Sequence, residues 1–157
     1  MGRLQDKVIL ITGGGSGIGR ATAIMAAAEG AKVVIGNRNA ERGEAVVAEI
    51  EAAGGQASFL KTDVTQEADL EALVKLAVDS YGGLQGAFTN AGVEQDFTPL
   101  GDTTTQAYRF VMDINVLGVL LSMKHQGPAM IASGGGAIVN NASVAGMIGM
   151  GTIPVYI

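Results

Sequence analysis

A short apolar run followed by a glycine-rich turn constrains the fold of this chain more than any other feature. Residues 8–11 read Val-Ile-Leu-Ile, and residues 12–19 read Thr-Gly-Gly-Gly-Ser-Gly-Ile-Gly. A buried strand that leads into such a turn and then into a helix is the unit that holds a dinucleotide pyrophosphate. Glycines are needed because a Cβ in the turn would keep the backbone N–H groups away from the phosphates.

The residues after the turn predict a helix that packs against a sheet. Its apolar face is expected to consist of residues at helical spacing, namely Ile18, Ala21, Met25 and Ala28. Gly30 is expected to end this helix, and a second strand is predicted at residues 32–35. Strand, turn, helix and strand within about 30 residues make one βαβ unit. An ordinary flexible loop at residues 12–19 is the less favoured alternative.

Short strands and amphipathic helices continue to alternate along the chain. Helices are predicted at residues 41–53, about 70–81 and 103–133, the last as one long helix or two abutting ones. Strands are predicted at residues 57–61, 86–89 and 137–141. The residues expected to share one face of the long helix are Phe110, Ile114, Leu117 and Leu121. This alternation predicts an α/β fold of the Rossmann type, a doubly wound parallel sheet in three α/β/α layers.

Composition excludes several classes of protein. The 157 residues, of which 48% are hydrophobic, fit a single folded domain over residues 1–157. A net charge of −5 argues against a nucleic-acid partner. The absence of cysteine and the single histidine, His125, argue against a metal site. We see no signal peptide and no apolar run of the ~18 residues that cross a membrane, so we expect a cytoplasmic domain without a membrane partner.

Polar and small residues stand at the carboxyl end of each predicted strand. They are the segments Thr12-Gly13, Asn37-Arg38, Asp63-Val64, Asn90-Ala91-Gly92 and Asn141-Ala142-Ser143. In a doubly wound sheet, ligands bind outside the carboxyl ends of the strands. Each segment alone could be a plain turn or cap, but the five together predict a binding crevice.

The ordered set of motifs resembles the short-chain dehydrogenase/reductase family along the whole chain. Gly13, Gly17 and Gly19 follow the G-x-x-x-G-x-G spacing of that family, and Ser143 and Tyr156 stand thirteen residues apart, as its serine and tyrosine do. The resemblance implies an NAD(P)-dependent oxidoreductase that interconverts a carbonyl and an alcohol. The glycine spacing argues against another dinucleotide-fold enzyme, such as a sugar-nucleotide epimerase.

The resemblance also implies roles for individual residues. Ser143 would orient the substrate oxygen, Tyr156 would act as general acid and base, and Asn115 would hold a water in a proton relay. The residues that would bind the cofactor are Gly13, Ser16, Gly17, Ile18, Gly19, Asn37, Arg38, Asp63, Val64, Asn90, Ala91 and Gly92. Among them, Asp63 would hydrogen-bond the adenine amino group, with the Val64 backbone beside it.

Considered without the resemblance, several of these residues could have a purely structural role. Ser143 could be a loop hydroxyl and Tyr156 an ordinary aromatic residue. Asn115 could face solvent from a helix. Asp63 could cap the following helix, although Thr65 suits that role better.

Residues 36–39, Gly-Asn-Arg-Asn, bear on the choice of cofactor. An acidic residue about 20 positions past the glycine turn binds the ribose 2′-hydroxyl of NAD, whereas an arginine accommodates a 2′-phosphate. No carboxylate stands in this stretch, and Arg38 can pair with a phosphate bidentately. We therefore predict that NADP(H) is preferred and that NAD(H) is possible. The alternative is that Arg38 is a solvated charge.

The family's tyrosine is followed four residues later by a lysine, whereas this sequence ends at Ile157. We expect a longer parent chain that adds the lysine, further strands and a loop that closes over the substrate. A non-catalytic NADP-binding module or sensor is the alternative if the protein ends at Ile157.

The expected partner is a small alcohol or ketone. It would be bordered by Asp96, Phe97 and the apolar stretch 145–153. The resemblance also implies a homo-oligomer, a dimer or tetramer. Its subunits would pair through the helix at 103–133 and through a helix that begins at Tyr156.

Overall fold

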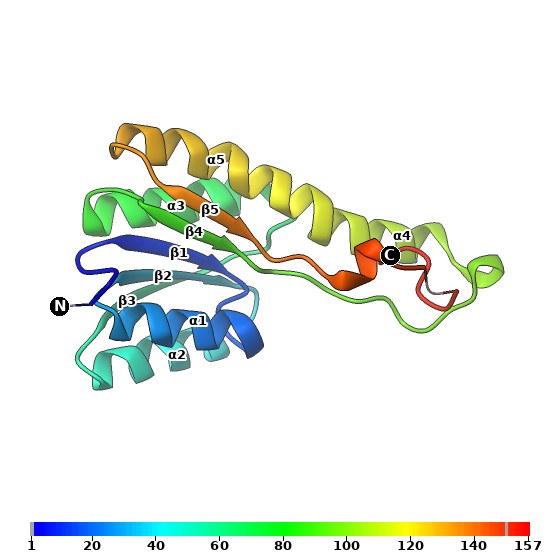
Figure 1. The fold of residues 1–157 in the computed structure, drawn as a ribbon, viewed down its shortest axis with the longest axis horizontal. Coiled ribbons are helices and arrows are strands. Elements are labelled where there is room, and N and C mark those ends of the chain that lie inside the picture. Colours follow the sequence, from blue (N-terminus) through cyan, green and yellow to red (C-terminus); the bar gives the residue numbers. More distant parts are fainter. Residues whose placement is uncertain (1, 150) are drawn as a thin grey trace.

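The computed structural model describes residues 2–149 and 151–157 and shows a parallel sheet of five strands between two layers of helices (Figure 1). The strands are β1 (Val8–Thr12), β2 (Lys32–Asn37), β3 (Gln56–Lys61), β4 (Gly86–Thr89) and β5 (Ala137–Asn140). Their order is β3-β2-β1-β4-β5, so the chain winds outward from β1 in one direction and then, starting at β4, in the other. The predicted doubly wound fold is confirmed, with its switch point between the carboxyl ends of β1 and β4.

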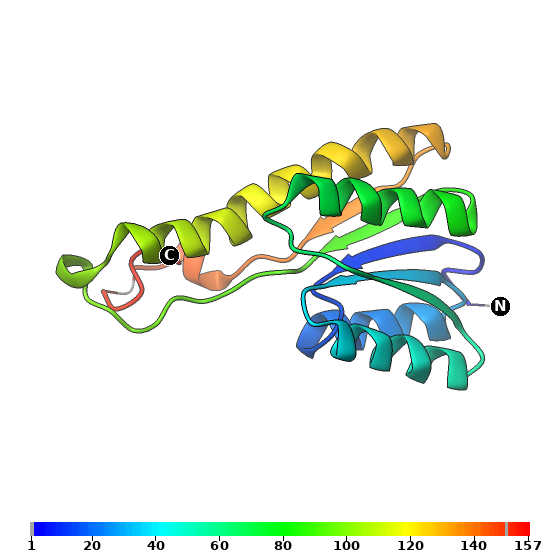
Figure 2. The same ribbon diagram turned by 180° about the vertical axis from the view of Figure 1, so that it is seen from behind.

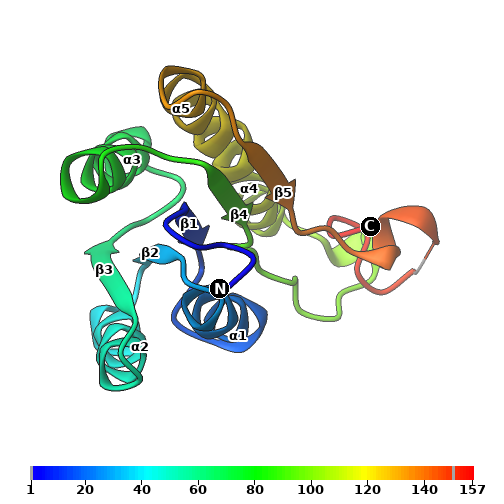
Figure 3. The ribbon, with the colours of Figure 1, turned by 60° about the vertical axis from the view of Figure 1, so that its left-hand side comes forward.

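Helices cover both faces of this sheet. Helices α1 (Gly17–Ala28) and α2 (Ala40–Ala52) lie on one face, and α3 (Glu67–Tyr81) and α5 (Gly118–Ala132) lie on the other (Figure 3). Helix α4 (Thr105–Met112) continues through a π-helical turn, η2 (Asp113–Leu117), into α5. The resulting rod extends past the carboxyl edge of the sheet, and the C-terminal segment folds beside it (Figures 1 and 2).

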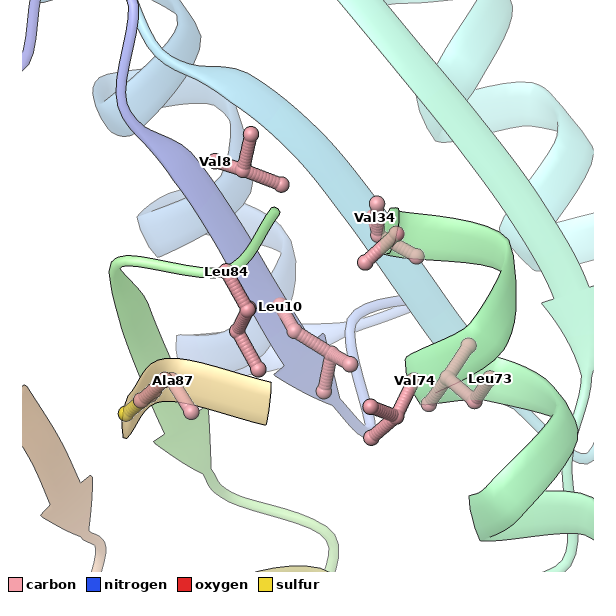
Figure 4. Close-up of a cluster of buried hydrophobic side chains, with 9 residues drawn as sticks. Val8, Leu10, Val34, Leu73, Val74, Leu84 and Ala87 are labelled. Atoms are coloured by element: carbon pink, nitrogen blue, oxygen red, sulfur yellow. The ribbon is translucent and has the colours of Figure 1, made fainter. Parts of the chain in front are cut away.

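Successive side chains of β1 belong in turn to two hydrophobic clusters, one on each face of the sheet. Val8 and Leu10 of β1 pack with Leu73 of α3 on one side of the sheet (Figure 4). Ile11 and its neighbour Ile35 on β2 pack instead against α1 and α2. A parallel strand that is buried on both faces reads as a continuous apolar run, and this is why β1 was recognisable in the sequence.

The apolar face predicted for the first helix is wrong. Its four members are exposed, Ile18 by 62% and Met25 by 65%. The residues of α1 that face the sheet are Gly19, Ala23 and Ala26. Small side chains let the helix approach the sheet closely. The predicted face took its phase from the two large residues, Ile18 and Met25, and both of these lie on the solvent side. The prediction for Gly30 holds, because it directly follows the helix's C-cap, Glu29.

The shared face predicted for the long helix is only partly correct. Ile114 and Leu121 are buried, with Val64 beside them, but Phe110 and Leu117 are 48% and 38% exposed. The π-helical turn accounts for the difference. It takes up extra residues per turn and so rotates the buried face of α4 relative to that of α5.

A charged cluster ties α5 to the start of α3. The carboxylate of Glu67 accepts hydrogen bonds from the Lys124 ammonium and from His125 Nε2, the latter at 3.0 Å. The Lys124 hydrogen bond, followed by that of His125, holds the pKa of the Glu67 carboxyl below its usual range. His125 therefore acts here as a partner of Glu67 at the surface between two helices.

Within residues 2–149 and 151–157, no helix is both long and apolar enough to cross a membrane.

Candidate functional site

A hydrogen-bond network joins the carboxyl ends of β1, β4 and β5. Thr12 Oγ1 accepts hydrogen bonds from the backbone N–H groups of Asn90 at 3.0 Å and Ala91 at 3.2 Å. Asn90 Nδ2 donates to the carbonyl oxygens of Thr12 at 3.2 Å and Gly13 at 3.3 Å. Asn141 Nδ2 in turn donates to Asn90 Oδ1 at 3.1 Å. The glycine turn is thus fixed from the side by the Asn-Ala-Gly segment.

The glycine turn has the geometry of a phosphate cradle. Gly17 has a φ of +51°, in the left-handed region that favours glycine. A Cβ on Gly19 would lie 2.3 Å from the carbonyl oxygen of Gly13, so only glycine allows α1 to start this close to the turn. The N-cap, Ser16, makes no side-chain capping hydrogen bond, and the first turn of α1 carries no acidic residue. The first N–H groups of α1 therefore have no side-chain cap, and they point toward the sheet edge.

A cavity of about 540 Å³ lies along this edge and is called the edge cavity below. Eleven of the twelve residues predicted to bind the cofactor line it, and the exception, Gly19, packs beneath the turn. Its lining also includes residues that the sequence analysis missed, namely Asn39, Arg42, Thr62, Val93 and Ile114. The four-residue spacing from Arg38 could have indicated Arg42. Val93 and Ile114 carry no such sequence signal.

Two arginines flank the end of β2. Asn39 caps α2, because its Oδ1 accepts the backbone N–H of Arg42 at 2.9 Å. Asn37 Nδ2 donates to the carbonyl oxygen of Asn39 at 2.9 Å, which holds this corner together. Arg38 and Arg42 are both exposed at the lining, and neither forms an ion pair with any residue that the structure describes. Both guanidinium groups are therefore available to an anionic ligand.

The Asp63 carboxylate is oriented by its own loop. Its Oδ1 accepts hydrogen bonds from the backbone N–H of Thr65 at 3.0 Å and from the Thr65 hydroxyl at 2.8 Å. The N-cap of α3 is Gln66, so neither Asp63 nor the alternative Thr65 caps that helix. Val64 is buried beside Ile114 and shapes the neighbouring wall.

A second cavity, of about 440 Å³, brings together the three residues predicted to be catalytic. Asn115, Ser143 and Tyr156 all line it, and it is called the Tyr156 cavity below. It shares the lining stretch 90–93 with the edge cavity, so the two adjoin. Residues from η2, from the segment that follows β5 and from the C-terminal turn thus converge beside the edge cavity.

The three side chains are held in different ways. Asn115 lies in η2, where its Oδ1 accepts the N–H of Val93 at 2.9 Å and its Nδ2 donates to the Val93 carbonyl at 2.7 Å. The alternative that Asn115 faces solvent is therefore wrong. Ser143 is exposed and caps the short 3₁₀ helix η3 (Val144–Met147), because its Oγ accepts the N–H of Ala145 at 3.1 Å.

Tyr156 is half-buried and lies in a turn. The helix expected to begin there stays a prediction, because only Ile157 follows Tyr156 in this sequence. Its hydroxyl makes no hydrogen bond in the described part of the chain, so this group is open to a ligand in the cavity.

Most of the residues expected to border the substrate do not line the Tyr156 cavity. Phe97 is 75% exposed and lines neither cavity, and Asp96 lines a separate hollow beside α4. Of the described residues in the stretch 145–153, Gly146 alone lines the Tyr156 cavity, and Met147 is 86% exposed. Met150 lies outside the described residues. Polar and apolar residues line the Tyr156 cavity about equally, and most of them come from the segments after β4 and β5, whereas the sequence analysis had expected an apolar wall from the stretch 145–153.

Comparison with known proteins defines the class of this protein. The family model described as short chain dehydrogenase matches residues 7–157, and the chain belongs to this family.

Among its relatives, a 2,5-dichloro-2,5-cyclohexadiene-1,4-diol dehydrogenase of Sphingobium indicum is 49% identical over 151 residues, which cover 96% of this chain and 59% of the relative. A cyclohexanol dehydrogenase of an Acinetobacter species is 42% identical over 155 residues, 99% of this chain and 62% of the relative. The crystal structure of an NAD⁺-bound xylitol dehydrogenase superposes with a TM-score of 0.94 at 34% identity and covers 98% of this chain and 59% of that one. The chain thus spans less than two thirds of the length of these relatives.

Proposed function

We propose that this protein is an NAD(P)-dependent oxidoreductase that interconverts a small alcohol and the corresponding ketone. The observation that carries the proposal is the convergence of Asn115, Ser143 and Tyr156 in a cavity that adjoins the edge cavity. Membership of the short chain dehydrogenase family supports it. The names of the two relatives, which are dehydrogenases of cyclic alcohols, support a cyclic secondary alcohol or ketone as the substrate class.

The edge cavity fits a nicotinamide dinucleotide. The close contact under Gly19 and the uncapped start of α1 form a cradle for its pyrophosphate. Asp63 and Val64 border the side of the cavity where the adenine would bind. When bound, the cofactor supplies a hydride donor or acceptor.

The chain's own residues handle the proton and the substrate oxygen. The Tyr156 hydroxyl donates a proton to the oxygen of a ketone, or takes one from an alcohol, as hydride moves. Ser143 hydrogen-bonds the same oxygen and orients it. Asn115 fixes the Val93 backbone, and the second N–H of its amide is the group that would hold a relay water.

The proposal is tested by separating binding from turnover. We expect the protein to bind NADPH, seen as a change in its fluorescence, and to oxidise it when cyclohexanone is added. Binding without consumption of NADPH across a panel of cyclic and linear ketones would instead support the alternative, a non-catalytic module or sensor.

We further propose that NADP(H) is preferred over NAD(H), supported by Arg38 and Arg42, which line the edge cavity and form no ion pair with a residue that the structure describes. Replacing Arg38 with alanine is expected to raise the dissociation constant of NADPH by about tenfold, because one charge-assisted hydrogen-bond pair to the 2′-phosphate is lost. The constant for NADH should stay nearly unchanged. Fluorescence titration measures both, and Arg109→Ala, which alters an exposed arginine of α4, is the matched control.

Unchanged NADPH affinity in the Arg38→Ala variant would contradict this assignment. The Arg42→Ala variant then shows whether the guanidinium that the sequence analysis missed is the one that carries the preference.

We also propose that the protein forms a homo-oligomer through the rod of α4, η2 and α5. This rod exposes the apolar side chains Tyr108, Phe110, Val116 and Leu120, by 48–58% each. Several large exposed apolar side chains on one element are typical of an interaction surface. The Leu120→Glu variant is expected to shift the molar mass measured by light scattering toward the monomer, whereas Leu100→Glu, off the rod, should not. Identical masses for wild type and Leu120→Glu would contradict this interface.

A further inference from the structure

Gln95 connects two segments that lie some sixty positions apart in the sequence. It belongs to the loop between β4 and α4, and its side chain is only 7% exposed. Its Oε1 accepts the backbone N–H of Val155 at 2.6 Å and that of Tyr156 at 3.1 Å. One buried oxygen therefore holds the backbone on which the Tyr156 ring is mounted.

The segment that carries Tyr156 is also held by the buried side chain of Ile153, which is 2% exposed, and by one backbone hydrogen bond. The structure gives residues 151–157 turns but no helix or strand. Thr98 donates its N–H to the carbonyl oxygen of Thr152 at 2.7 Å, so the loop around Gln95 and this segment run side by side (Figures 1 and 2). Tyr156 N–H also reaches the carbonyl of Ile153 at 3.1 Å, a local turn that does not connect to the rest of the fold. Among the described residues, Gln95 is the side chain that ties the backbone at Tyr156 to the rest of the fold by hydrogen bonds.

The loop that carries Gln95 is itself fixed to a rigid element. Asn115, in η2, binds both backbone groups of Val93, two residues before Gln95. The two amide side chains therefore act in series. η2 holds the loop through Asn115, and the loop holds Tyr156 through Gln95.

The two polar atoms of the Gln95 amide differ, because its oxygen accepts two hydrogen bonds and its nitrogen has no partner among the described residues. Its Nε2 is buried and has no hydrogen-bond partner among residues 2–149 and 151–157. Burying an unpaired amide N–H is unfavourable, so a residue needed only for packing would be better as leucine or methionine. Glutamine at this position is accounted for by the two N–H groups that its oxygen accepts.

We propose that Gln95 is a positioning residue for Tyr156, setting where the phenol stands in the Tyr156 cavity by anchoring the backbone at residues 155 and 156. Its effect on turnover rests on the function proposed above. A bound ketone and the Tyr156 hydroxyl must meet at hydrogen-bond distance, and displacement of such a group by about 1 Å costs large factors in rate.

The first test reads the position of Tyr156 without cofactor or substrate. The chain has three tyrosines, and Tyr156→Phe assigns the Tyr156 signal in a spectrum of ring-labelled protein. We expect Gln95→Leu to shift or broaden this signal, because the Val155 N–H loses its acceptor and the Tyr156 N–H keeps only the local carbonyl of Ile153. Gln95→Glu keeps an oxygen in place and should leave the signal close to that of wild type. Gln106→Leu, an exposed glutamine of α4 that lines the same hollow beside Gln95, is the matched control.

The second test reads turnover. Gln95→Leu is expected to lower kcat for cyclohexanone reduction by about tenfold or more, with the dissociation constant of NADPH unchanged. Gln95→Glu should recover most of the loss. A folded Gln95→Leu protein with wild-type kcat and an unmoved Tyr156 signal would overturn the proposal. If the wild-type protein turns over nothing, the proposed function fails, and the Tyr156 signal still decides the role of Gln95.

A measurement on the wild-type protein covers the case in which Gln95→Leu does not fold. The amide protons of Val155 and Tyr156 should exchange slowly with solvent, although they lie outside any helix or strand. Exchange at the rate of an unstructured peptide would show that the anchor does not exist, and would overturn the proposal.

Discussion

The Tyr156→Phe variant is expected to lower kcat by about a hundredfold to ten-thousandfold, the range that general acid–base groups contribute. The substitution removes one hydroxyl and keeps the ring, so the packing of the turn at Tyr156 should survive. Tyr156 lines the cavity that holds Asn115 and Ser143 but not the edge cavity, so the dissociation constant of NADPH should not change. The two readouts together separate a role in chemistry from a role in cofactor binding.

Steady-state rates with cyclohexanone and fluorescence titration with NADPH measure these two quantities. Tyr108→Phe, at an exposed position on α4, is the matched control and should match wild type in both. A Tyr156→Phe protein that keeps most of its kcat would remove Tyr156 from the mechanism. A protein that loses NADPH binding together with kcat would show that the phenol is needed for structure.

The parts of the fold that sequence could predict are those encoded locally. The β1 run and the glycine turn are contiguous, and their order predicts the βαβ unit with little freedom. The face of α1 was mispredicted because alanines lie on both sides of the helix, so the two large residues Ile18 and Met25 decided the predicted phase. The contact with the sheet instead requires small residues, which are Gly19, Ala23 and Ala26.

The residues of the candidate site likewise fall into those that the local sequence could predict and those that it could not. Residues at strand ends, such as Asn90 and Arg38, could be placed at one edge because parallel strands all end there. Gln95 could not, because its partners lie on an irregular segment some sixty residues away and no periodicity links the two. The outward position of Met147 likewise depends on η3, a short turn that only the folded chain defines.

The Gly19→Ala variant is expected to lose both cofactor affinity and stability. The added Cβ would lie 2.3 Å from the Gly13 carbonyl oxygen and 2.6 Å from Asn90 Nδ2. The first contact is with backbone, which cannot rotate away, so the turn must move and the Asn90–Gly13 hydrogen bond must stretch. We expect the free energy of unfolding to fall by about 1–3 kcal/mol, the usual cost of overpacking. The NADPH dissociation constant should rise by about tenfold or more, since each 1.4 kcal/mol of lost binding is tenfold.

The matched control is a glycine with room for a side chain, Gly101→Ala in the short 3₁₀ helix η1 (Leu100–Asp102). No atom lies within 4 Å of a Cβ at that position, and its φ is not positive. Alanine there should stabilise the protein by about 0.5–1 kcal/mol through lower backbone entropy in the unfolded chain. Thermal unfolding should therefore show lower stability for Gly19→Ala and higher stability for the control. NADPH titration should show weaker binding for Gly19→Ala alone. A Gly19→Ala protein that binds NADPH as wild type does and unfolds at the same temperature would contradict this prediction. It would show that the turn does not contact α1 as closely as the 2.3 Å approach implies, and that this contact does not set the phosphate-binding geometry.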